Sequence, residues 1–538
     1  MVLENDSDEL RWSDSYTVKA TRVSLTSNLF EDYTAWKTNQ TSRVDYNNGA
    51  VKIITSFESD LPMKFRIHPE TTETELNKIA CHFVYDVLFD DNVKLDQILP
   101  SVTEDELYEA VGNDTVEEIY ATKFEYNEKD LEEEVRKTIW ASYNDDYGWI
   151  PIKHEVEKFN VVLGSLVRHD IWTFFDYDPS FEDEEVFDTD KYGCEEGSAV
   201  KHTADSEKLT KELLFFDPDN EKHLDHVFTH FKNKFNRNYA HKTEHALRKS
   251  IFDENVRLIT SVNRRNLTYK LGVNQFSDWT PEEIKRSNGA VPRPVGRVGT
   301  VAFPYEDSNL QDVVNKLPRE YDMRVFGLIS PVKNQESCGS CWTFAAAAVV
   351  ESGMARINGG KVLSLSNQAI VDCAYEELGE FGAGGCNGGF DYAAYDFIVK
   401  HGLPTDQEYG PYKNQDGYCN IGNMTKTYEI TGYTDVTRYN FDAMKVAVVN
   451  HGPLFIYVHA SEQFQAYSSG IFYQSNEDCD PEHPNHAVTL VGYGESYGEL
   501  FWILKNSWGE SWGVDGYMLI AAKNNVCGVP AHPSYPVF

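Results

Sequence analysis

The chain has 538 residues, of which 41% are hydrophobic and 25% charged, a composition typical of a globular protein with three or four domains. It contains no apolar run of about eighteen residues, so no membrane-spanning helix is expected. The formal net charge of −37 argues against nucleic acid and anionic membrane surfaces as partners.

The negative charge is unevenly distributed. Residues 1–204 carry a net charge of −26, residues 205–317 carry +2, and residues 318–538 carry −13. A nearly neutral segment therefore lies between two acidic ones. Any attraction between the neutral segment and its neighbours should weaken as pH falls toward carboxylate pKa values.

The first 204 residues are predicted to form a mainly antiparallel β domain. Ser42 to Ile53 has alternating apolar residues around an Asn-Gly pair, which supplies the positive φ angles of a tight hairpin. Val156 to Tyr177 is rich in β-branched and aromatic residues, with Gly164 at a bulge or turn. The acidic stretch Thr103 to Tyr120 is predicted as a helix, and Phe181 to Asp190 as a solvated linker or loop.

Residues 205–290 contain a strong helical pattern. Its apolar members recur at helical spacing within the set Glu244, Arg248, Ile251, Phe252, Asn255, Ile259 and Asn263. Spacing alone would suit any amphipathic helix. Residues 291–317 are rich in Pro and Gly and then extended, which is typical of an exposed linker.

A reactive thiol is predicted at Cys341. It precedes the apolar run Phe344 to Val350, which predicts a helix, and the positive end of a helix dipole lowers a thiol pKa. Gln335 lies six residues earlier and could donate hydrogen bonds to a developing oxyanion. Such a site still needs a histidine base and a residue to orient it.

Both missing parts are found downstream. His486 heads the β-prone run to Gly494, and Asn506 precedes Ser-Trp-Gly. Taken singly, a cysteine in this chain is more often structural, a histidine is more often a surface or core group, and such an Asn is more often a turn residue. The three together, with their flanking sequences, resemble the papain family of cysteine proteases in its cathepsin L-like branch.

The resemblance implies an α+β fold and a set of roles. Residues 318–538 would form a two-lobed peptidase with a helical lobe and a β barrel-like lobe. Cys341 would be the nucleophile, His486 the general acid and base, and Asn506 the residue that holds the imidazole. Gln335 and the Cys341 backbone N–H would form the oxyanion hole, and Trp508 would shield the Asn506–His486 hydrogen bond.

Residues 205–290 resemble the inhibitory prodomain of the same family. The matching motif positions are Glu244, Arg248, Phe252, Asn255, Ile259 and Asn263 in one motif, and Asn274, Phe276 and Asp278 in a second. The resemblance implies a prodomain that runs through the substrate cleft in reverse. Cleavage near Leu317-Pro318, at the end of the 291–317 linker, would release the enzyme.

The resemblance also implies a substrate cleft with an unusual pocket. Gly339, Gly388 and Gly389 would lie at the cleft and approach substrate backbone closely. The pocket for the second residue before the cut would be lined by Phe390, Asp391, Tyr457, Pro484 and His532, with Trp508 at the far side of the cleft. Its polar members predict a weaker preference for large aliphatic side chains and some tolerance of a basic or polar one. Alternatively, Asp391 points to solvent and His532 only closes the wall.

The cysteines and glycosylation signals indicate an oxidising compartment. The family pattern pairs Cys338 with Cys386, Cys373 with Cys419, and Cys479 with Cys527; Cys81 and Cys194 are left as a further candidate pair. Asn-x-Ser/Thr acceptors stand at Asn5, Asn39, Asn113, Asn266 and Asn423. The first twelve residues have no signal-peptide pattern, so either the start is misassigned or a segment is missing. A lysosomal, granular or extracellular location is expected.

The extra N-terminal region makes the whole chain similar to the insect two-chain haemocyte cysteine proteinases. That resemblance implies an N-terminal chain that stays attached after processing. Expected partners are protein and peptide substrates and the chain's own prodomain, with no cofactor and no metal. Two function classes remain: an endopeptidase with an accessory β domain, or a secreted binding protein whose peptidase stays latent.

Overall fold

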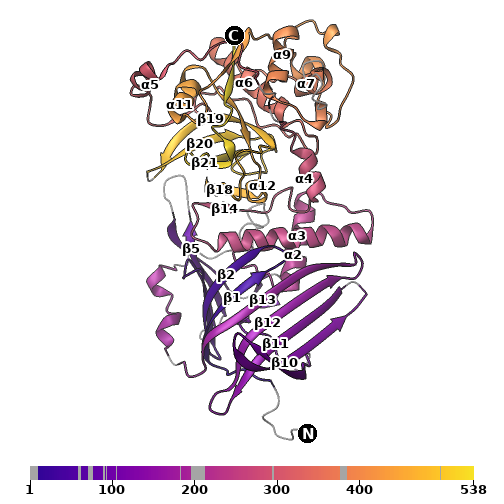
Figure 1. Cartoon of the computed structure of the whole chain (residues 1–538), viewed down its shortest axis with the longest axis vertical. Coiled ribbons are helices and arrows are strands. Elements are labelled where there is room, and N and C mark those ends of the chain that lie inside the picture. The colour runs from indigo at the N-terminus through magenta and orange to yellow at the C-terminus, as the bar shows by residue number, and fades with distance from the viewer. Residues whose placement is uncertain are drawn as a thin grey trace. The chain divides into compact units, whose positions relative to one another are not determined.

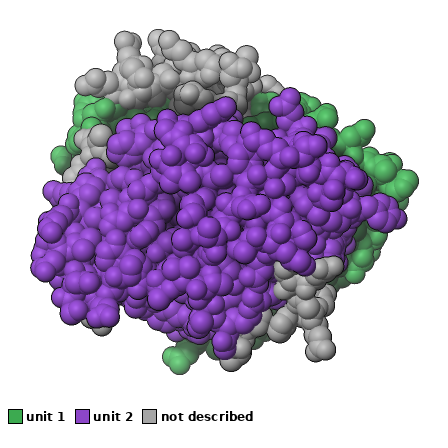
Figure 2. Space-filling view, turned by 90° about the horizontal axis from the view of Figure 1, so that it is seen from above, with its two compact units in different colours: residues 1–70, 77–267 green, residues 71–76, 268–538 purple. Residues whose placement is uncertain are grey.

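The computed structural model describes residues 10–538 except 58–61, 71–76, 86, 89–90, 93, 104–105, 132, 182, 195–212, 292, 294–295, 376–383 and 497. The chain divides into two compact units, one of residues 1–70 and 77–267 and one of residues 71–76 and 268–538 (Figures 1 and 2). Within the described residues, no helix is both long enough and apolar enough to cross a membrane.

The first unit is built on an eleven-stranded antiparallel sheet in the order β6-β5-β4-β3-β2-β1-β13-β12-β11-β10-β9. The strands are β1 (Tyr16–Ser24), β2 (Leu29–Lys37), β3 (Thr41–Tyr46), β4 (Val51–Ser56), β5 (Met63–Glu70), β6 (Lys78–Tyr85), β9 (Glu109–Val116), β10 (Ile119–Lys129), β11 (Glu133–Asn144), β12 (Gly148–Asn160) and β13 (Ser165–Asp178). A separate small hairpin joins β7 (Val87–Leu88) and β8 (Asp91–Asn92).

The predicted hairpin at Ser42 to Ile53 and the predicted turn at Gly164 are confirmed. Strands β3 and β4 pair antiparallel, and Asn47, Asn48 and Gly49 in the turn have positive φ angles of 50°, 57° and 78°. Strands β12 and β13 pair across a turn that contains Gly164, whose φ is 66°. The turn residues therefore determine where the chain reverses.

Of the two predictions for acidic stretches, the helix is wrong. Thr103 to Tyr120 contains β9 and the start of β10 rather than a helix, because β9 pairs along β10 as the edge strand of the sheet. The segment from Phe181 to Asp190 has exposed acidic residues at Asp183, Glu184, Glu185, Asp188 and Asp190, as expected for a solvated loop. It contains the short 3₁₀ helix η1 (Glu184–Phe187), followed by η2 (Asp190–Tyr192), and Phe187 is buried.

Two α-helices are found in the described part of the first unit. Helix α2 (Glu221–Lys234) and helix α3 (Lys242–Asn263) pack on each other, and α3 contacts strand β2 (Figure 1). The predicted helical pattern of residues 244–263 is confirmed, with Phe252 and Ile259 fully buried. Residues 205–290 are thus shared between the two units, which divide after Leu267.

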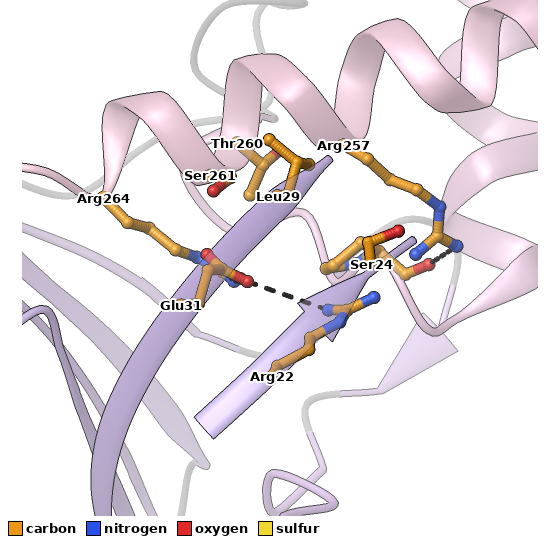
Figure 3. Close-up of a pocket in the computed structure, with 9 residues that line it drawn as sticks. Arg22, Ser24, Leu29, Glu31, Arg257, Thr260, Ser261 and Arg264 are labelled. Carbon is orange, nitrogen blue, oxygen red and sulfur yellow. Dashed lines mark hydrogen bonds and ion pairs between the residues drawn. The ribbon is translucent and has the colours of Figure 1, made fainter. Parts of the chain in front are cut away.

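Buried charges join α3 to the sheet. Arg264 at the end of α3 donates to Glu31 of β2 at 3.2 Å, and Glu31 also faces Arg22 of β1 (Figure 3). Asp170 of β13 has no exposed side-chain surface and accepts from Arg22 at 2.7 Å. Arg257 of α3 lies 3.9 Å from the same carboxylate. Burial favours the neutral form of Asp170, but the surrounding arginines hold its pKa well below the ordinary value.

The second unit has a helical part and a sheet. The helices are α4 (Pro281–Ser287), α5 (Asp307–Val314), α6 (Cys341–Ile357), α7 (Asn367–Cys373), α9 (Asp391–His401), α10 (Asp406–Tyr409), α11 (Phe441–Asn450) and α12 (Glu462–Gln465), with 3₁₀ turns η5 (Gly385–Asn387), η6 (Ile421–Asn423) and η7 (Val526–Gly528). Helix α6 is buried along nearly its whole length, against α7, α9 and the sheet.

The sheet of the second unit has nine strands, in the order β14-β18-β21-β20-β19-β17-β22-β16 with β15 on β19. They are β14 (Tyr269–Leu271), β15 (Tyr321–Asp322), β16 (Gly432–Asp435), β17 (Leu454–Val458), β18 (Tyr467–Phe472), β19 (His486–Ser496), β20 (Glu499–Lys505), β21 (Tyr517–Ala521) and β22 (Ser534–Val537). The fold is α+β: the first unit is built on an antiparallel sheet, and the second combines a helical part with a mixed sheet.

The linker of residues 291–317 is only partly extended, which differs from the prediction. Helix α5 forms within it because Glu306 and Asn309 make a capping box and Leu310 is buried beside α11. Leu317 is half-buried and Pro318 is exposed.

The described cysteines form four disulfides. They join Cys338 to Cys386, Cys373 to Cys419, Cys479 to Cys527, and Cys81 to Cys194. Cys341 is the free cysteine and is buried. The Cys81–Cys194 disulfide joins β6 to the segment that follows η2. It therefore holds the end of the acidic segment of residues 181–190 close to the sheet.

Candidate active site

Cys341 is the first residue of α6 and has no exposed surface. Backbone N–H groups of Ala487, Gly289 and Trp342 are directed at its thiol. Burial nevertheless raises the thiol pKa to about 11, and these hydrogen bonds only reduce the rise. The predicted lowering of this pKa is therefore not seen while Gly289 covers the thiol.

His486 is the first residue of β19, and the backbone N–H of the next residue, Ala487, is directed at the Cys341 thiol. Its Nε2 lies 2.8 Å from Asn506 Oδ1, and its ring stacks on Trp508 with centroids 4.4 Å apart. Its Nδ1 has no hydrogen-bond partner among the described residues. Burial lowers the His486 pKa to about 4, although the Asn506 contact favours the protonated ring.

Gln335 holds its side-chain amide in a fixed orientation. Its Oε1 accepts from the Ser507 hydroxyl at 2.7 Å, which leaves the NH₂ group to face the site. That group donates to the carbonyls of Cys338 and Ser287, at 2.9 and 2.8 Å. Ser287 is the last residue of helix α4. A carbonyl of the prodomain therefore accepts from the Gln335 amide, which is the group predicted to donate to an oxyanion.

The second prodomain motif packs on the residues around His486. The ring of Phe276 packs edge-to-face against that of Trp508, with ring centroids 4.9 Å apart, and the Gln275 side chain donates to the Trp508 carbonyl at 2.6 Å. Asn274 donates to the carbonyl of Gln465 at 2.7 Å, and β14 pairs with β18. Asp278 is buried beside them. This part of the prodomain is an integral layer of the second unit.

The chain after α4 runs against the three predicted cleft glycines. A Cβ on Gly289 would overlap the Gly339 carbonyl oxygen at 1.7 Å, and one on Gly388 would meet the Gly289 oxygen at 2.6 Å. Gly389 donates to Gly289 at 2.9 Å and accepts from Val291 at 3.0 Å. The Ala290–Gly389 bridge is parallel. Only glycines permit this backbone approach.

The predicted side-chain pocket opens beside Gly389. Phe390, Asp391 and Tyr457 are buried, whereas Pro484 and His532 are half-buried. Asp391 does not point to solvent, because its carboxylate binds the guanidinium of Arg293 from the linker. His532 contributes its backbone carbonyl to that guanidinium.

Sequence reasoning missed Arg293, Tyr392 and Asp435 at this pocket. Tyr392 and Asp435 both contact the Arg293 guanidinium. The Arg between two prolines in the linker and the acid at the start of α9 were the available signals. Nothing local connects them, since they lie 98 residues apart.

The remaining predicted sites are distributed over the surface. Asn39, Asn113, Asn266 and Asn423 are all exposed, as glycan acceptors must be, and Asn5 lies outside the described residues. In the first prodomain motif, Glu244 accepts from the Ala240 N–H at 3.0 Å and so closes the start of α3.

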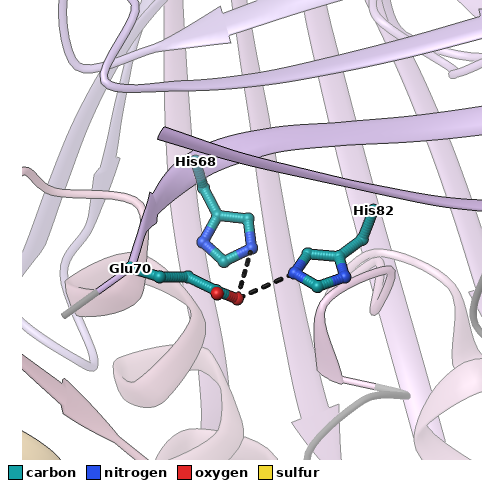
Figure 4. A group of neighbouring side chains, drawn as sticks. All are labelled: His68, Glu70 and His82. Atoms are coloured by element: carbon teal, nitrogen blue, oxygen red, sulfur yellow. Dashed lines mark hydrogen bonds and ion pairs between the residues drawn. The ribbon is translucent and has the colours of Figure 1, made fainter. Parts of the chain in front are cut away.

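One group of side chains could hold a metal ion within the described part of the chain. His68 and Glu70 of β5 and His82 of β6 place donor atoms within 4.8 Å of one another (Figure 4). Glu70 Oε1 lies 2.8 Å from His82 Nε2 and 3.6 Å from His68 Nε2. Two imidazoles and a carboxylate suit Zn²⁺. The group belongs to the first unit and has no part in the thiol site.

Comparisons with known proteins identify the family of two segments of the chain. Residues 317–537 match the papain family cysteine protease, and residues 228–284 match the cathepsin propeptide inhibitor domain (I29). Mouse cathepsin K is 35% identical over 322 residues, which are 59% of this chain and 94% of cathepsin K. Pro-cathepsin H of Medicago truncatula is 37% identical over 312 residues, 58% of this chain and 85% of that protein.

A solved structure is similar to part of the chain in fold and sequence. Digestive procathepsin L2 proteinase from Tenebrio molitor larval midgut has a TM-score of 0.52 and 31% identity, and the match covers 59% of this chain and all of that one. The chain belongs to the papain family of cysteine proteases. It is a cysteine protease with an inhibitory propeptide and an additional N-terminal sheet domain.

Proposed function

We propose that the chain is a cysteine endopeptidase zymogen that uses Cys341, His486 and Asn506. The observation that carries the proposal is the 2.8 Å contact between His486 and Asn506 beside a thiol at the start of α6. The contact orients the imidazole so that Nδ1 is free to exchange a proton.

The reaction is acyl transfer to sulfur followed by hydrolysis. His486 takes the Cys341 proton, and the thiolate attacks the scissile carbonyl carbon. The oxyanion is bound by the Gln335 amide and the Cys341 backbone N–H. His486 then protonates the leaving amine. A water molecule, deprotonated by His486, attacks the thioester and releases the carboxylic acid product and the free thiol.

The prodomain inhibits the reaction because it covers the active site. With Gly289 on the thiol, burial gives Cys341 a pKa of about 11 and His486 one of about 4, so both groups are neutral at pH 7. Removal of the cover readmits water and allows the thiolate–imidazolium pair to form.

Acid triggers activation, because the covered site resists protonation. The uncovered His486 returns toward its ordinary pKa of about 6.5 and binds a proton that the covered form, with a pKa of about 4, does not. Between these values a falling pH therefore favours the uncovered form. Conversion of the purified zymogen should be faster near pH 4.5 than at pH 7, and equal rates would contradict acid triggering.

The location that fits this chemistry is a lysosome or granule, where acid and oxidising conditions meet. Four disulfides and four exposed glycan acceptors support it. We further propose that the N-terminal chain stays attached after cleavage near Leu317. A mass spectrum of the matured protein, under native and denaturing conditions, reports cleavage sites and retained chains together.

Titration with an irreversible epoxide inhibitor after acid treatment tests the function. We expect one thiol per chain to be labelled at Cys341, peptide turnover to appear, and both to be lost in Cys341→Ala. The second candidate, a binding protein with a latent peptidase, predicts neither labelling nor turnover after the linker is cut.

A further inference from the structure

The pocket beside Gly389 contains a side chain from the chain's own linker. Arg293 lies two residues after Val291, which pairs with Gly389, and its side chain is only 5% exposed. The family resemblance assigns this pocket to the second residue before the cleaved bond. The linker thus presents an arginine where a substrate would place that residue.

The pocket satisfies the whole guanidinium group. Nε donates to Asp391 Oδ1 at 2.8 Å, and Nη2 donates to Asp391 Oδ2 and to the His532 carbonyl at 3.2 Å. Nη1 donates to the Tyr392 hydroxyl at 3.2 Å and to Asp435 Oδ1 at 3.0 Å. All five N–H bonds of an arginine side chain therefore have an acceptor.

The buried carboxylate of Asp391 is positioned to bind a cation. Its side chain has no exposed surface, and neutral donors already hold both oxygens: the Tyr457 hydroxyl at 2.8 Å and the Ser534 hydroxyl at 2.6 Å. These contacts fix its orientation but leave its negative charge unpaired. The guanidinium carbon lies 4.4 Å from the ring centre of Tyr392 and 5.6 Å from that of Tyr457, so aromatic faces complete the cation site.

We propose that this pocket selects arginine as the second residue before the cleaved bond, with Asp391 as the specificity-determining residue and Arg293 as its resident occupant in the zymogen. The proposal rests on the proposed peptidase function and names its substrate class. Arg293 anchors the linker in the cleft until cleavage removes it.

The geometry favours arginine over other residues. Lysine has three donors on a compact ammonium group, so it cannot meet acceptors placed around a planar fork. Leucine or phenylalanine would bury the Asp391 charge without a partner, and sites built for a hydrogen-bonding group reject analogues that lack it.

Four matched fluorogenic dipeptide substrates test the selectivity. They share arginine at the cleaved bond and carry arginine, citrulline, lysine or leucine before it; citrulline keeps the shape of arginine without its charge. With enzyme concentration set by epoxide titration, kcat/KM for arginine should exceed each of the others by about tenfold or more. A leucine substrate cleaved as well as the arginine substrate would overturn the proposal.

Asp391→Asn should abolish the preference for arginine while the leucine substrate is still cleaved. Asp396→Asn is the matched control, because Asp396 lies on the same helix and pairs with the partly exposed Arg297 instead of Arg293. A wild-type preference retained in Asp391→Asn would contradict the assigned role. Should Asp391→Asn fail to fold, the four wild-type rates decide the question.

A measurement that needs no catalysis separates this inference from the peptidase function. In the Cys341→Ala zymogen, both Arg293→Ala and Arg293→Lys should lower the thermal midpoint by several degrees, and the control Arg297→Ala should change it much less. If no substrate is turned over but this order holds, the peptidase proposal fails and the guanidinium pocket stands. If Arg293→Ala leaves the midpoint unchanged, the pocket assignment fails.

Discussion

The side-chain amide of Gln335 contacts both the peptidase and the prodomain. Ser507 fixes its oxygen, and its NH₂ group donates to the Ser287 carbonyl in the zymogen. We propose that the same NH₂ group binds the oxyanion once the prodomain leaves. Local sequence predicted the presence of this amide near Cys341, but its orientation depends on Ser507, which lies 172 residues away.

Gln335→Ala should lower kcat of the activated enzyme by about 10²–10³, since it removes a donor that strengthens only as the oxyanion forms. The measurement is kcat per titrated active site. Gln415→Ala, at an exposed position of the same lobe, is the control and should be neutral. A loss of less than about threefold for Gln335→Ala would exclude the amide from the oxyanion hole.

The alkylation rate of the Cys341 thiol should depend on whether the prodomain covers it. Because burial raises its pKa to about 11, the zymogen at pH 7 should react with iodoacetamide far more slowly than the mature enzyme does. Alkylation of the zymogen should also keep rising well above pH 9, as expected for a thiol that is deprotonated only there. Equal rates for the two forms would show that the prodomain does not cover the thiol.

At the scale of single elements, helix α4 delivers the Ser287 carbonyl to Gln335. Its N-terminus is closed by a capping box in which Thr280 accepts from Glu283 N–H and Glu283 accepts from Thr280 N–H. At its other end, Ser287 is one of the carbonyls that a helix leaves unpaired, and the Gln335 amide supplies the missing donor. The short helix is thus held from both ends.

Thr280→Ala should destabilise the zymogen by about 1 kcal/mol, the usual cost of a lost N-cap, and should speed its conversion. Thermal denaturation of the Cys341→Ala form measures the first effect, and conversion of the active form measures the second. Glu282→Gln, exposed in the same turn, is the control. A slower conversion in Thr280→Ala would contradict the role of α4 as part of the cover.

Element prediction succeeded where local geometry decides. The Asn-Gly turn placed β3 and β4, and helical spacing placed α3. It failed over residues 103–120, where the sequence alone favoured a helix. There the strand β9 exists because β10 offers a free edge, and pairing with a neighbour overrides local propensity.

At the scale of the whole molecule, the N-terminal sheet and the prodomain helices α2 and α3 form one compact unit. Arg257 and Arg264 of α3 face Asp170 and Glu31 of the sheet, and these charges are largely removed from water. Breaking a buried charge network by removing one partner leaves the others uncompensated. The sheet therefore stabilises the fold of α3.

Asp170→Asn should destabilise the first unit by at most about 3–5 kcal/mol, because Arg22 and Arg168 lose their fully buried carboxylate and keep the partly exposed Asp219. Faster hydrogen exchange at the amides of α3 would localise the effect. Asp176→Asn on the same strand is the control. Its pair with Lys19 is mostly exposed, so the change should cost less than about 1 kcal/mol.

The pH dependence of this network follows from the Asp170 pKa. A carboxylate whose native pKa is depressed stabilises the fold above its unfolded pKa of about 4, and this contribution is lost only as pH falls through the native value. Because the arginines hold that value well below the ordinary one, mild acid should leave α3 attached to the sheet. Acid activation is thus expected at the cleft, and hydrogen exchange of α3 at pH 4.5 should remain slow.

The sequence by itself determined the family resemblance, the candidate residues Cys341, His486 and Asn506, and the turns of the N-terminal hairpins. These features lie in short segments whose residue types and spacing carry the information. Tertiary structure alone decided the strand at β9, the raised Cys341 pKa and the filling of the Asp391 pocket by Arg293. Burial and charge pairing depend on partners far away in the chain, and no local pattern specifies which partners meet.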